Sequence, residues 1–345
     1  MIKIAILSPI AWRTPPRHYG PWESVASNIT EELVKRGHDV TLYATGDSKT
    51  AAKLKSVCPQ GYEENPDIIP KVWESLHISN LFEEANQYDI IHNHFDFLPL
   101  TYSAMTTTSI VTTIHGFSSP GIIPVYQKYK HKMHYVSISD SDRAQELNYA
   151  ATVHHGLDIR DFTFKSYPED YLLYFGRIHP DKGTHEAIQI AKECGMRLVI
   201  AGIIQDQQYF LKSVKPELAR GRIDYIGSVG PKERNTLLGN ARVLLHPIYF
   251  EEPFGLSVIE SMACGTPVIA YNRGSMPELI IDRKTGYLVE NVKEAVVAVK
   301  NVDQIKRIDC RTHVENHFTI EKMVSKYEDI YENILTPKLN QILNS

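Results

Sequence analysis

Short apolar runs alternate with longer amphipathic segments along the first half of the chain. The run IKIAILS at residues 2–8 precedes a polar loop, and an amphipathic segment extends from about Pro21 to Arg36. The proline at the start of this segment and Gly37 after its end are typical of a helix, and the apolar run DVTLYAT follows. Further strands are predicted at residues 89–94, 109–115 and 134–139. The intervening segments are long enough for parallel crossovers, so we expect a doubly wound parallel sheet of six strands, five of which these runs provide.

The same alternation restarts at about Asp170. Amphipathic segments predict helices at residues 183–195 and 255–265. Strands are predicted at residues 171–176, 197–202, 222–227, 241–247 and 266–271. Together these elements indicate a second parallel sheet covered by helices.

The segment between the two patterns, residues 159–169, has no periodicity and is interpreted as the linker between two domains. We expect an N-terminal domain over residues 1–160 and a C-terminal domain over residues 165–319. A final helix at about 320–345 carries apolar side chains at helical spacing and is expected to pack back on the first domain. The predicted fold class is therefore α/β, with two Rossmann-like domains.

Composition and charge narrow the classes of function. A chain of 345 residues with 43% hydrophobic residues is long enough for two cores. Its net charge of −4 lacks the basic field of a dedicated nucleic-acid binder, so no nucleic-acid partner is expected. Four scattered cysteines indicate neither a zinc site nor a disulfide framework, which favours the cytoplasm. No apolar stretch reaches the roughly 20 residues of a membrane span.

Two cations follow the first strand of the second half, in the segment YFGRIHPDKG. Arg177 and Lys182 lie five residues apart, on either side of a predicted helix start. The planar fork of an arginine, the compact charge of a lysine and the helix amides together suit a diphosphate. The alternative is two solvated surface cations beside a turn.

Two carboxylates mark the segment EEPFGLSVIESMACGTPV. Seven residues separate Glu252 from Glu260, and Gly255 stands between them. A glycine there allows the backbone to approach a ligand closely, and Glu260 one turn into the following helix is suited to a ribose diol. Glu252 would then face a sugar. Alternatively, Glu252 is a loop charge and Glu260 an exposed helix residue.

The two segments, about seventy residues apart, together resemble the retaining glycosyltransferases of family 4, whose fold is the two-domain GT-B type. The segments RGHDVTLYATGDS, TTIHG, YVSISDSDR and VHHGLD are also similar to that family, so the resemblance covers nearly the whole chain. It implies two Rossmann-like domains that face each other across a cleft, with the active site between them.

The resemblance also implies roles for individual residues. Arg177 and Lys182 would bind the donor diphosphate, Glu252 the transferred sugar and Glu260 the ribose. Backbone amides at Gly255 would contact phosphate or sugar. The expected donor-binding set is Gly20, Gly176, Arg177, Lys182, Glu252, Phe254, Gly255, Leu256 and Glu260, and the expected catalytic set is His115, Arg177, Lys182 and Glu252.

Two positions depart from the family pattern. The familiar paired glycines of the first loop are replaced by YGPW, so Pro21 and Trp22 follow Gly20 on the acceptor side. In VHHGLD, His155 stands where the family more often has asparagine.

No metal is expected to take part in the reaction. Asp140 and Asp142 spell the Asp-x-Asp triplet of metal-dependent transferases, but Ser139 and Asp142 are interpreted as the cap of a helix at 142–150. Two fixed cations already suit the leaving group.

A second candidate metal site lies in the run IIHNHFDF. His92, His94 and Asp96 alternate there and would share one face of a strand. They are interpreted as a polar strand end that lines the cleft, with a metal site as the alternative.

The expected reaction transfers a hexose from a nucleoside diphosphate sugar to a hydroxyl acceptor with retention, and UDP is favoured over GDP. The resemblance implies front-face attack without a dedicated protein base. The alternatives are a GT-B sugar-nucleotide epimerase or disaccharide phosphorylase, and a noncatalytic nucleotide-sugar-binding module. The basic run QKYKHKMH, residues 127–134, is interpreted as a solvated helix face, with weak peripheral membrane contact as the alternative. The acceptor and the oligomeric state stay open.

Overall fold

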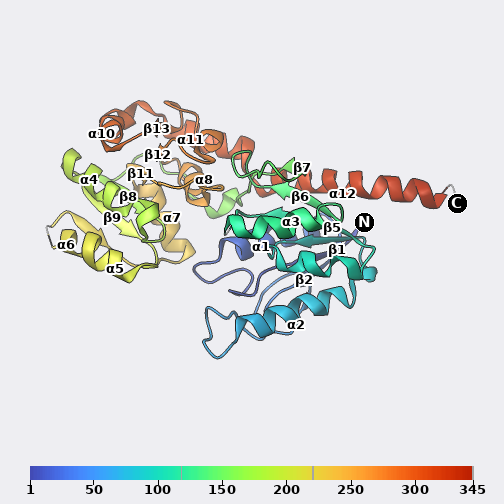
Figure 1. Cartoon of the computed structure of the whole chain (residues 1–345). Helices are drawn as coiled ribbons and strands as arrows, with labels where there is room; N and C mark the ends of the chain where they lie inside the picture. The colour runs from blue at the N-terminus through green and yellow to red at the C-terminus, as the bar shows by residue number, and fades with distance from the viewer. Residues whose placement is uncertain (118, 220, 344–345) are drawn as a thin grey trace. The chain divides into compact units, whose positions relative to one another are not determined.

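The computed structural model describes residues 1–117, 119–219 and 221–343, with backbone only for residues 337–343. The chain divides into two compact units (Figure 1). The first comprises Met1–Gly156 together with the chain from Ile320 onward, and the second comprises Leu157–Thr319. The expected α/β fold class with two parallel-sheet, Rossmann-like domains is confirmed.

The first unit is built on a parallel sheet with the strand order β3-β2-β1-β4-β5-β6-β7. Its strands are β1 Lys3–Leu7, β2 Asp39–Tyr43, β3 Lys53–Lys55, β4 Ile90–Asn93, β5 Ser109–Ile114, β6 Met133–Ser137 and β7 Tyr149–Thr152. Its α-helices are α1 Pro21–Lys35, α2 Pro70–Phe82, α3 Ile123–Tyr129 and α12 Ile320–Leu343. Short 3₁₀ helices lie at Ala85–Gln87, Leu98–Met105 and Pro120–Ile122.

The seventh strand corrects a prediction, because β7 occupies part of the segment expected as a helix at 142–150. The Asp142 amide does donate to Ser139 Oγ at 3.1 Å, as a cap would require. Turns follow instead of a helix, and the Ala144 amide donates to the Tyr149 hydroxyl at 2.9 Å. This loop closure starts β7 beside β6, with Tyr149 opposite Tyr135. The sheet therefore has seven strands where six were expected.

The basic run at residues 127–134 also differs from its interpretation as one helix face. Helix α3 ends at Tyr129, and Met133, which is buried, already begins strand β6.

Among the described residues, every helix is too short or too polar to cross a bilayer.

Helix α12 returns the C-terminal segment of the chain to the first unit. Its Tyr327 and Tyr331 side chains are fully buried. At its outer edge, Glu328 Oε1 lies 2.9 Å from His38 Nε2, and the Glu321 carbonyl accepts from the Arg36 guanidinium at 2.7 Å. Polar contacts to the turn after α1 thus flank the apolar packing of α12.

The second unit repeats the design with the strand order β10-β9-β8-β11-β12-β13, all parallel. Its strands are β8 Tyr171–Phe175, β9 Arg197–Ala201, β10 Ile223–Tyr225, β11 Val243–His246, β12 Val268–Tyr271 and β13 Gly286–Val289. Its α-helices are α4 Thr184–Cys194, α5 Gln207–Tyr209, α6 Lys215–Leu218, α7 Pro231–Asn240, α8 Leu256–Ala263, α9 Met276–Leu279, α10 Val292–Asn301 and α11 Arg307–His317. A π-helical turn spans Phe210–Val214, and 3₁₀ turns lie at Ile159–Asp161, Pro180–Lys182 and Val302–Gln304.

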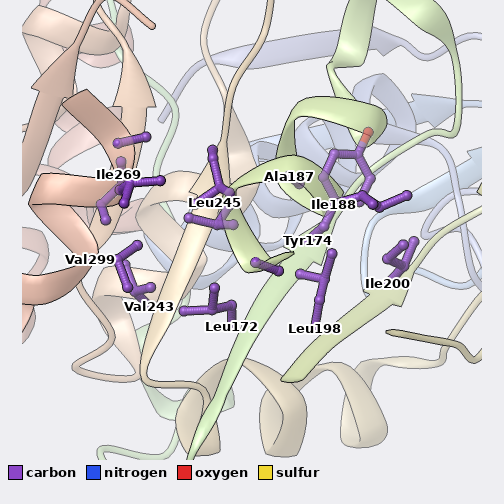
Figure 2. Packing of buried hydrophobic residues seen from close by; sticks show 14 of the residues in the cluster. Leu172, Tyr174, Ala187, Ile188, Leu198, Ile200, Val243, Leu245, Ile269 and Val299 are labelled. Atoms are coloured by element: carbon purple, nitrogen blue, oxygen red, sulfur yellow. The ribbon is translucent and has the colours of Figure 1, made fainter. Parts of the chain in front are cut away.

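One apolar core lies between this sheet and the helices α4 and α10. Figure 2 shows Leu172 and Leu245 from neighbouring strands, Ile188 from α4 and Val299 from α10 among its members. These side chains are at most 3% exposed. The apolar runs of the central strands β8 and β11 are therefore buried, as expected for a parallel sheet covered by helices.

Residues 159–169, expected as the linker, form part of the second unit. The Arg311 guanidinium donates to the Phe162 carbonyl at 2.6 Å. Arg307 is 9% exposed, and its guanidinium donates to the Lys165 carbonyl at 2.7 Å. Such bonds between a side chain and a distant carbonyl leave no periodic signal in the sequence, so the segment resembled a linker. Along the chain, the boundary between the two units lies between residues 156 and 157.

The Arg307 contacts predict a stability effect. Besides Lys165, its guanidinium donates to the carbonyls of Ala241 and Gly239 and to Thr266 Oγ1 at 2.5 to 3.0 Å. Arg307→Met keeps the volume but leaves these buried acceptors unpaired, so we expect about 3 kcal/mol lower free energy of unfolding in urea denaturation.

The matched control is Arg197→Met. Arg197 pairs with Asp224 at 2.8 Å on the surface, where its side chain is 55% exposed. We expect this change to cost less than about 1 kcal/mol. Equal stability of the two variants would contradict the anchoring role of Arg307.

Candidate active site

The sequence-predicted cations follow strand β8, at the carboxyl edge of the second sheet. Lys182 ends the 3₁₀ turn Pro180–Lys182, just before helix α4. Gly183 then adopts a φ of +69°, and a Cβ there would lie 1.9 Å from the Pro247 carbonyl oxygen. Only glycine allows this approach, which brings the α4 start against the loop after β11. The Tyr249 amide also donates to the Asp181 carbonyl at 2.9 Å.

This close approach joins Lys182 to Glu252. The Lys182 ammonium lies 2.6 Å from Glu252 Oε2, and the two side chains are only 14% and 15% exposed. The ammonium also lies 4.4 Å from the centroid of the Phe250 ring. Neighbouring His246 stays neutral, because burial and then the Lys182 charge lower its pKa to about 3. Lys182 and Glu252 are therefore not the solvated surface charges that the alternative interpretations of the sequence proposed.

The loop that carries Glu252 is held by the loop after β12. The Ser275 amide donates to the Glu252 carbonyl at 3.0 Å, and the Gly274 amide donates to Glu251 Oε2 at 2.5 Å. Gly274 has a φ of +54°, and a Cβ there would lie 2.4 Å from the Glu252 nitrogen. The backbone on both sides of the carboxylate is therefore fixed before any ligand binds.

Gly255 immediately precedes helix α8 and adopts a left-handed backbone conformation. Its φ is +94°, and a Cβ there would meet the Met276 methyl carbon at 2.8 Å. Leu256 is the first residue of α8, whose start has no side-chain cap. Phe254 is buried and packs edge-on against Phe318. These residues place the amide end of α8 beside the loop that carries Glu252.

Glu260, one turn into α8, is buried rather than exposed. It is 6% exposed, and its Oε1 lies 3.0 Å from a terminal guanidinium nitrogen of Arg234 on α7. Burial raises the pKa of Glu260, and the Arg234 charge opposes that rise. Sequence reasoning missed Arg234, because a cation on the polar helix PKERNTLL has the pattern of an ordinary solvated face.

Arg177 makes a different contact from Lys182. It follows Gly176 at the end of β8, and its guanidinium donates to Gln205 Oε1 in the loop after β9. The structure thus brings Lys182 and Glu252 into direct contact, while Arg177 is held by a neutral amide.

Gly20 and His115 lie in the first unit, whereas the other predicted site residues lie in the second. Gly20 precedes α1 with a φ of +144°, and a Cβ there would be 2.9 Å from Pro16 Cβ. His115 follows β5 and is 8% exposed. The ring of Trp22 stacks on it at 5.5 Å with an interplanar angle of 21°. The tryptophan that departs from the family pattern therefore covers the predicted catalytic histidine.

The candidate metal ligands of the first unit have other roles. His92 and His94 are both fully buried. Asp96 Oδ1 accepts from the Tyr126 hydroxyl at 2.6 Å. Within the described part of the chain, no group of three or more histidine, cysteine, aspartate and glutamate side chains is arranged to hold a metal.

Two family models match the chain, and their boundary coincides with the boundary between the units. The model of Glycosyltransferase Family 4 matches residues 23–156, and the model of Glycosyl transferases group 1 matches residues 158–313. Together they cover every strand of both sheets except β1.

Individual relatives agree with the family models. The chain is 25% identical to N-acetyl-alpha-D-glucosaminyl L-malate synthase of Bacillus anthracis over 92% of this chain and 94% of that protein. It is 31% identical to an uncharacterised 41.2 kDa protein in the cps region of Klebsiella pneumoniae, but over only 47% of this chain and 46% of that one.

Among solved structures, HepE of Anabaena in complex with UDP and glucose has a TM-score of 0.74 at 16% identity. This match covers 96% of the present chain and all of HepE. It supports the GT-B fold, and the matches as a whole do not favour an epimerase, a phosphorylase or a noncatalytic module. The chain belongs to the glycosyltransferases of group 1 and family 4, and it is a transferase with the GT-B fold.

Proposed function

We propose that the protein is a retaining hexosyltransferase that uses a nucleoside diphosphate sugar, UDP-sugar in preference to GDP-sugar, without a metal. The observation that carries the proposal is the Lys182–Glu252 contact of 2.6 Å beside the start of α8. A cation, a carboxylate and helix amides are thereby combined at the carboxyl edge of a parallel sheet, where such folds bind ligands.

In this proposal Lys182 and Arg177 neutralise the diphosphate. Negative charge grows on the departing diphosphate in the transition state, and fixed cations stabilise it without reorganisation. The amides at Gly255 and Leu256 add donors at a helix N-terminus. The two side-chain cations supply the charge that a metal provides in other transferases. The leaving phosphate oxygen accepts the proton of the attacking hydroxyl, so no dedicated protein base is needed.

The carboxylates hold the sugar and the ribose. Glu252 accepts from a hydroxyl of the transferred hexose, and Glu260 accepts from the ribose diol, since one carboxylate bonds paired hydroxyls well. His115 contacts the hexose from the first unit. HepE, which shares the fold, was crystallised with UDP and glucose, and this supports UDP as the nucleotide.

Removing the Lys182 charge tests the electrostatic part of this proposal. Lys182→Ala is expected to lower kcat by about a hundredfold or more, because a preorganised charge is lost. Release of nucleoside diphosphate from UDP-sugar donors measures the rate. The control is Lys192→Ala, since Lys192 lies on the exposed face of α4, paired with Glu217 at 3.0 Å. Wild-type turnover in Lys182→Ala would reject the assignment.

A ligand pair tests the role of Glu260. Glu260→Gln is expected to weaken binding of UDP by about tenfold, because hydrogen bonds to a charged acceptor are lost. Affinity for 2′,3′-dideoxyuridine diphosphate should not change, since that ligand lacks the diol. Calorimetry measures both affinities. An equal loss for the two ligands would show that Glu260 does not bind the ribose.

The metal-free mechanism and the stereochemistry have their own tests. Dialysis against a chelator should leave the turnover of UDP-sugar unchanged, and proton NMR of the product should show the anomeric configuration of the donor. Activity that is lost on chelation and restored by Mg²⁺ or Mn²⁺ would overturn metal independence. An inverted product would overturn retention.

A further inference from the structure

A group of buried histidines lies at the carboxyl end of the first sheet. His92 lies in the second half of β4 (Ile90–Asn93), His94 follows that strand, His115 follows β5 and His155 follows β7. The ring centroids of His92 and His94 are 4.0 Å apart, and His115 lies 5.2 Å from both His94 and His155. These distances place the imidazoles in one contiguous cluster.

His92 is a structural member of this cluster. Its Nε2 lies 2.8 Å from Thr113 Oγ1, and its Nδ1 lies 2.7 Å from the Tyr331 hydroxyl of α12. Both ring nitrogens are therefore satisfied within the protein, and the residue ties α12 to the sheet.

His94 and His115 are bonded differently. His94 Nδ1 lies 2.9 Å from His115 Nε2, whereas His94 Nε2 and His115 Nδ1 are buried without a hydrogen-bond partner among the described residues. A buried nitrogen without a partner costs free energy in the folded protein, and such groups recur where a ligand completes the bonding. The pair therefore presents two open hydrogen-bonding positions.

The bond between the two rings couples their tautomers. Burial lowers the pKa of both histidines well below the ordinary value, so both rings are neutral. If His94 donates, His115 carries its proton on Nδ1 and can donate there. If His115 donates, its Nδ1 is an acceptor and His94 Nε2 carries a proton. One open nitrogen thus always donates while the other accepts.

The orientation of His115 is fixed as well. Trp22 stacks on it at 5.5 Å and 21°, and the His155 ring lies 5.2 Å away at 30°. Because its Nε2 is bonded to His94, Nδ1 is the nitrogen of the His115 ring that stays open to a ligand. A sugar hydroxyl matches this position, because a hydroxyl both donates and accepts.

We propose that His94 is a positioning residue, which fixes the ring and the tautomer of His115 so that His115 Nδ1 bonds a hydroxyl of the transferred sugar. This inference rests on the proposed hexosyltransferase function. His115 Nδ1 donates to the hydroxyl in one tautomer and accepts from it in the other. The pair changes between these two states without movement of either ring.

The test compares two substitutions of His94. His94→Leu removes the bond to His115, whereas His94→Asn keeps a polar group at the place of Nδ1. We expect His94→Leu to lower kcat/KM for the sugar donor by about tenfold, as for the loss of one hydrogen bond. His94→Asn should restore most of that loss. The affinity for UDP should not change in either variant, because UDP lacks the hexose.

Nitrogen NMR of ring-labelled histidines measures the hydrogen bond between the rings and the tautomer of His115. Neither would change if His94 had a purely structural role. In the wild-type protein, a scalar coupling across the hydrogen bond should join His94 Nδ1 to His115 Nε2. In His94→Leu, the His115 ring should average over both tautomers. The matched control is Tyr331→Phe, which removes the hydroxyl bonded to His92 and should leave the coupling and the kinetics unchanged.

Each outcome decides one question. Absence of the coupling in the wild-type protein would overturn the positioning role, whatever the variants do. Wild-type kinetics in His94→Leu would overturn it as well. A wild-type protein that shows the coupling but transfers no sugar from any donor would overturn the proposed function and the hydroxyl contact, while the coupled pair would stand.

Discussion

The Lys182–Glu252 contact depends on how closely three backbone segments approach one another at one edge of the second sheet. A side chain at Gly183 would collide with the Pro247 carbonyl, and one at Gly274 would collide with the Glu252 nitrogen. Glycine at both positions lets the turn before α4 and the loop after β12 close around the loop after β11. The ion pair of 2.6 Å is a consequence of that backbone packing rather than its cause.

The same packing explains why the site keeps charges in poorly hydrated positions. The side chains of Lys182, Glu252 and Glu260 are each at most 15% exposed, and a buried ion pair contributes little to stability once its desolvation cost is counted. Such pairs do hold charged groups in fixed positions before a ligand arrives. Under the proposed function, that preorganisation is their value, because the diphosphate and the hydroxyls meet groups that need not move.

The sequence predicted those parts of the protein whose signal is local. Parallel strands were recognised from apolar runs. Lys182 and Glu252, which were selected from their spacing around glycine turns, lie in direct contact, while their roles in binding stay predictions. Arg234, strand β7 and the anchoring of residues 159–169 were missed, because each depends on a contact between distant segments. The carboxylate of Glu260 meets the guanidinium of Arg234 from another helix, and the Tyr149 hydroxyl that closes the turn before β7 gives no periodic pattern.

The histidines of the first unit show the same limit at the scale of one strand. The alternation of His92 and His94 correctly placed both on one face, where their rings lie 4.0 Å apart. Their different roles depend on the side chains that bond to each of the two rings. Tyr331 of α12 and Thr113 of β5 saturate His92, whereas His94 bonds His115 and retains an open nitrogen. A contact from a helix more than two hundred residues away in sequence thus makes His92 a structural histidine, whereas His94 is left to position His115 under the proposed function.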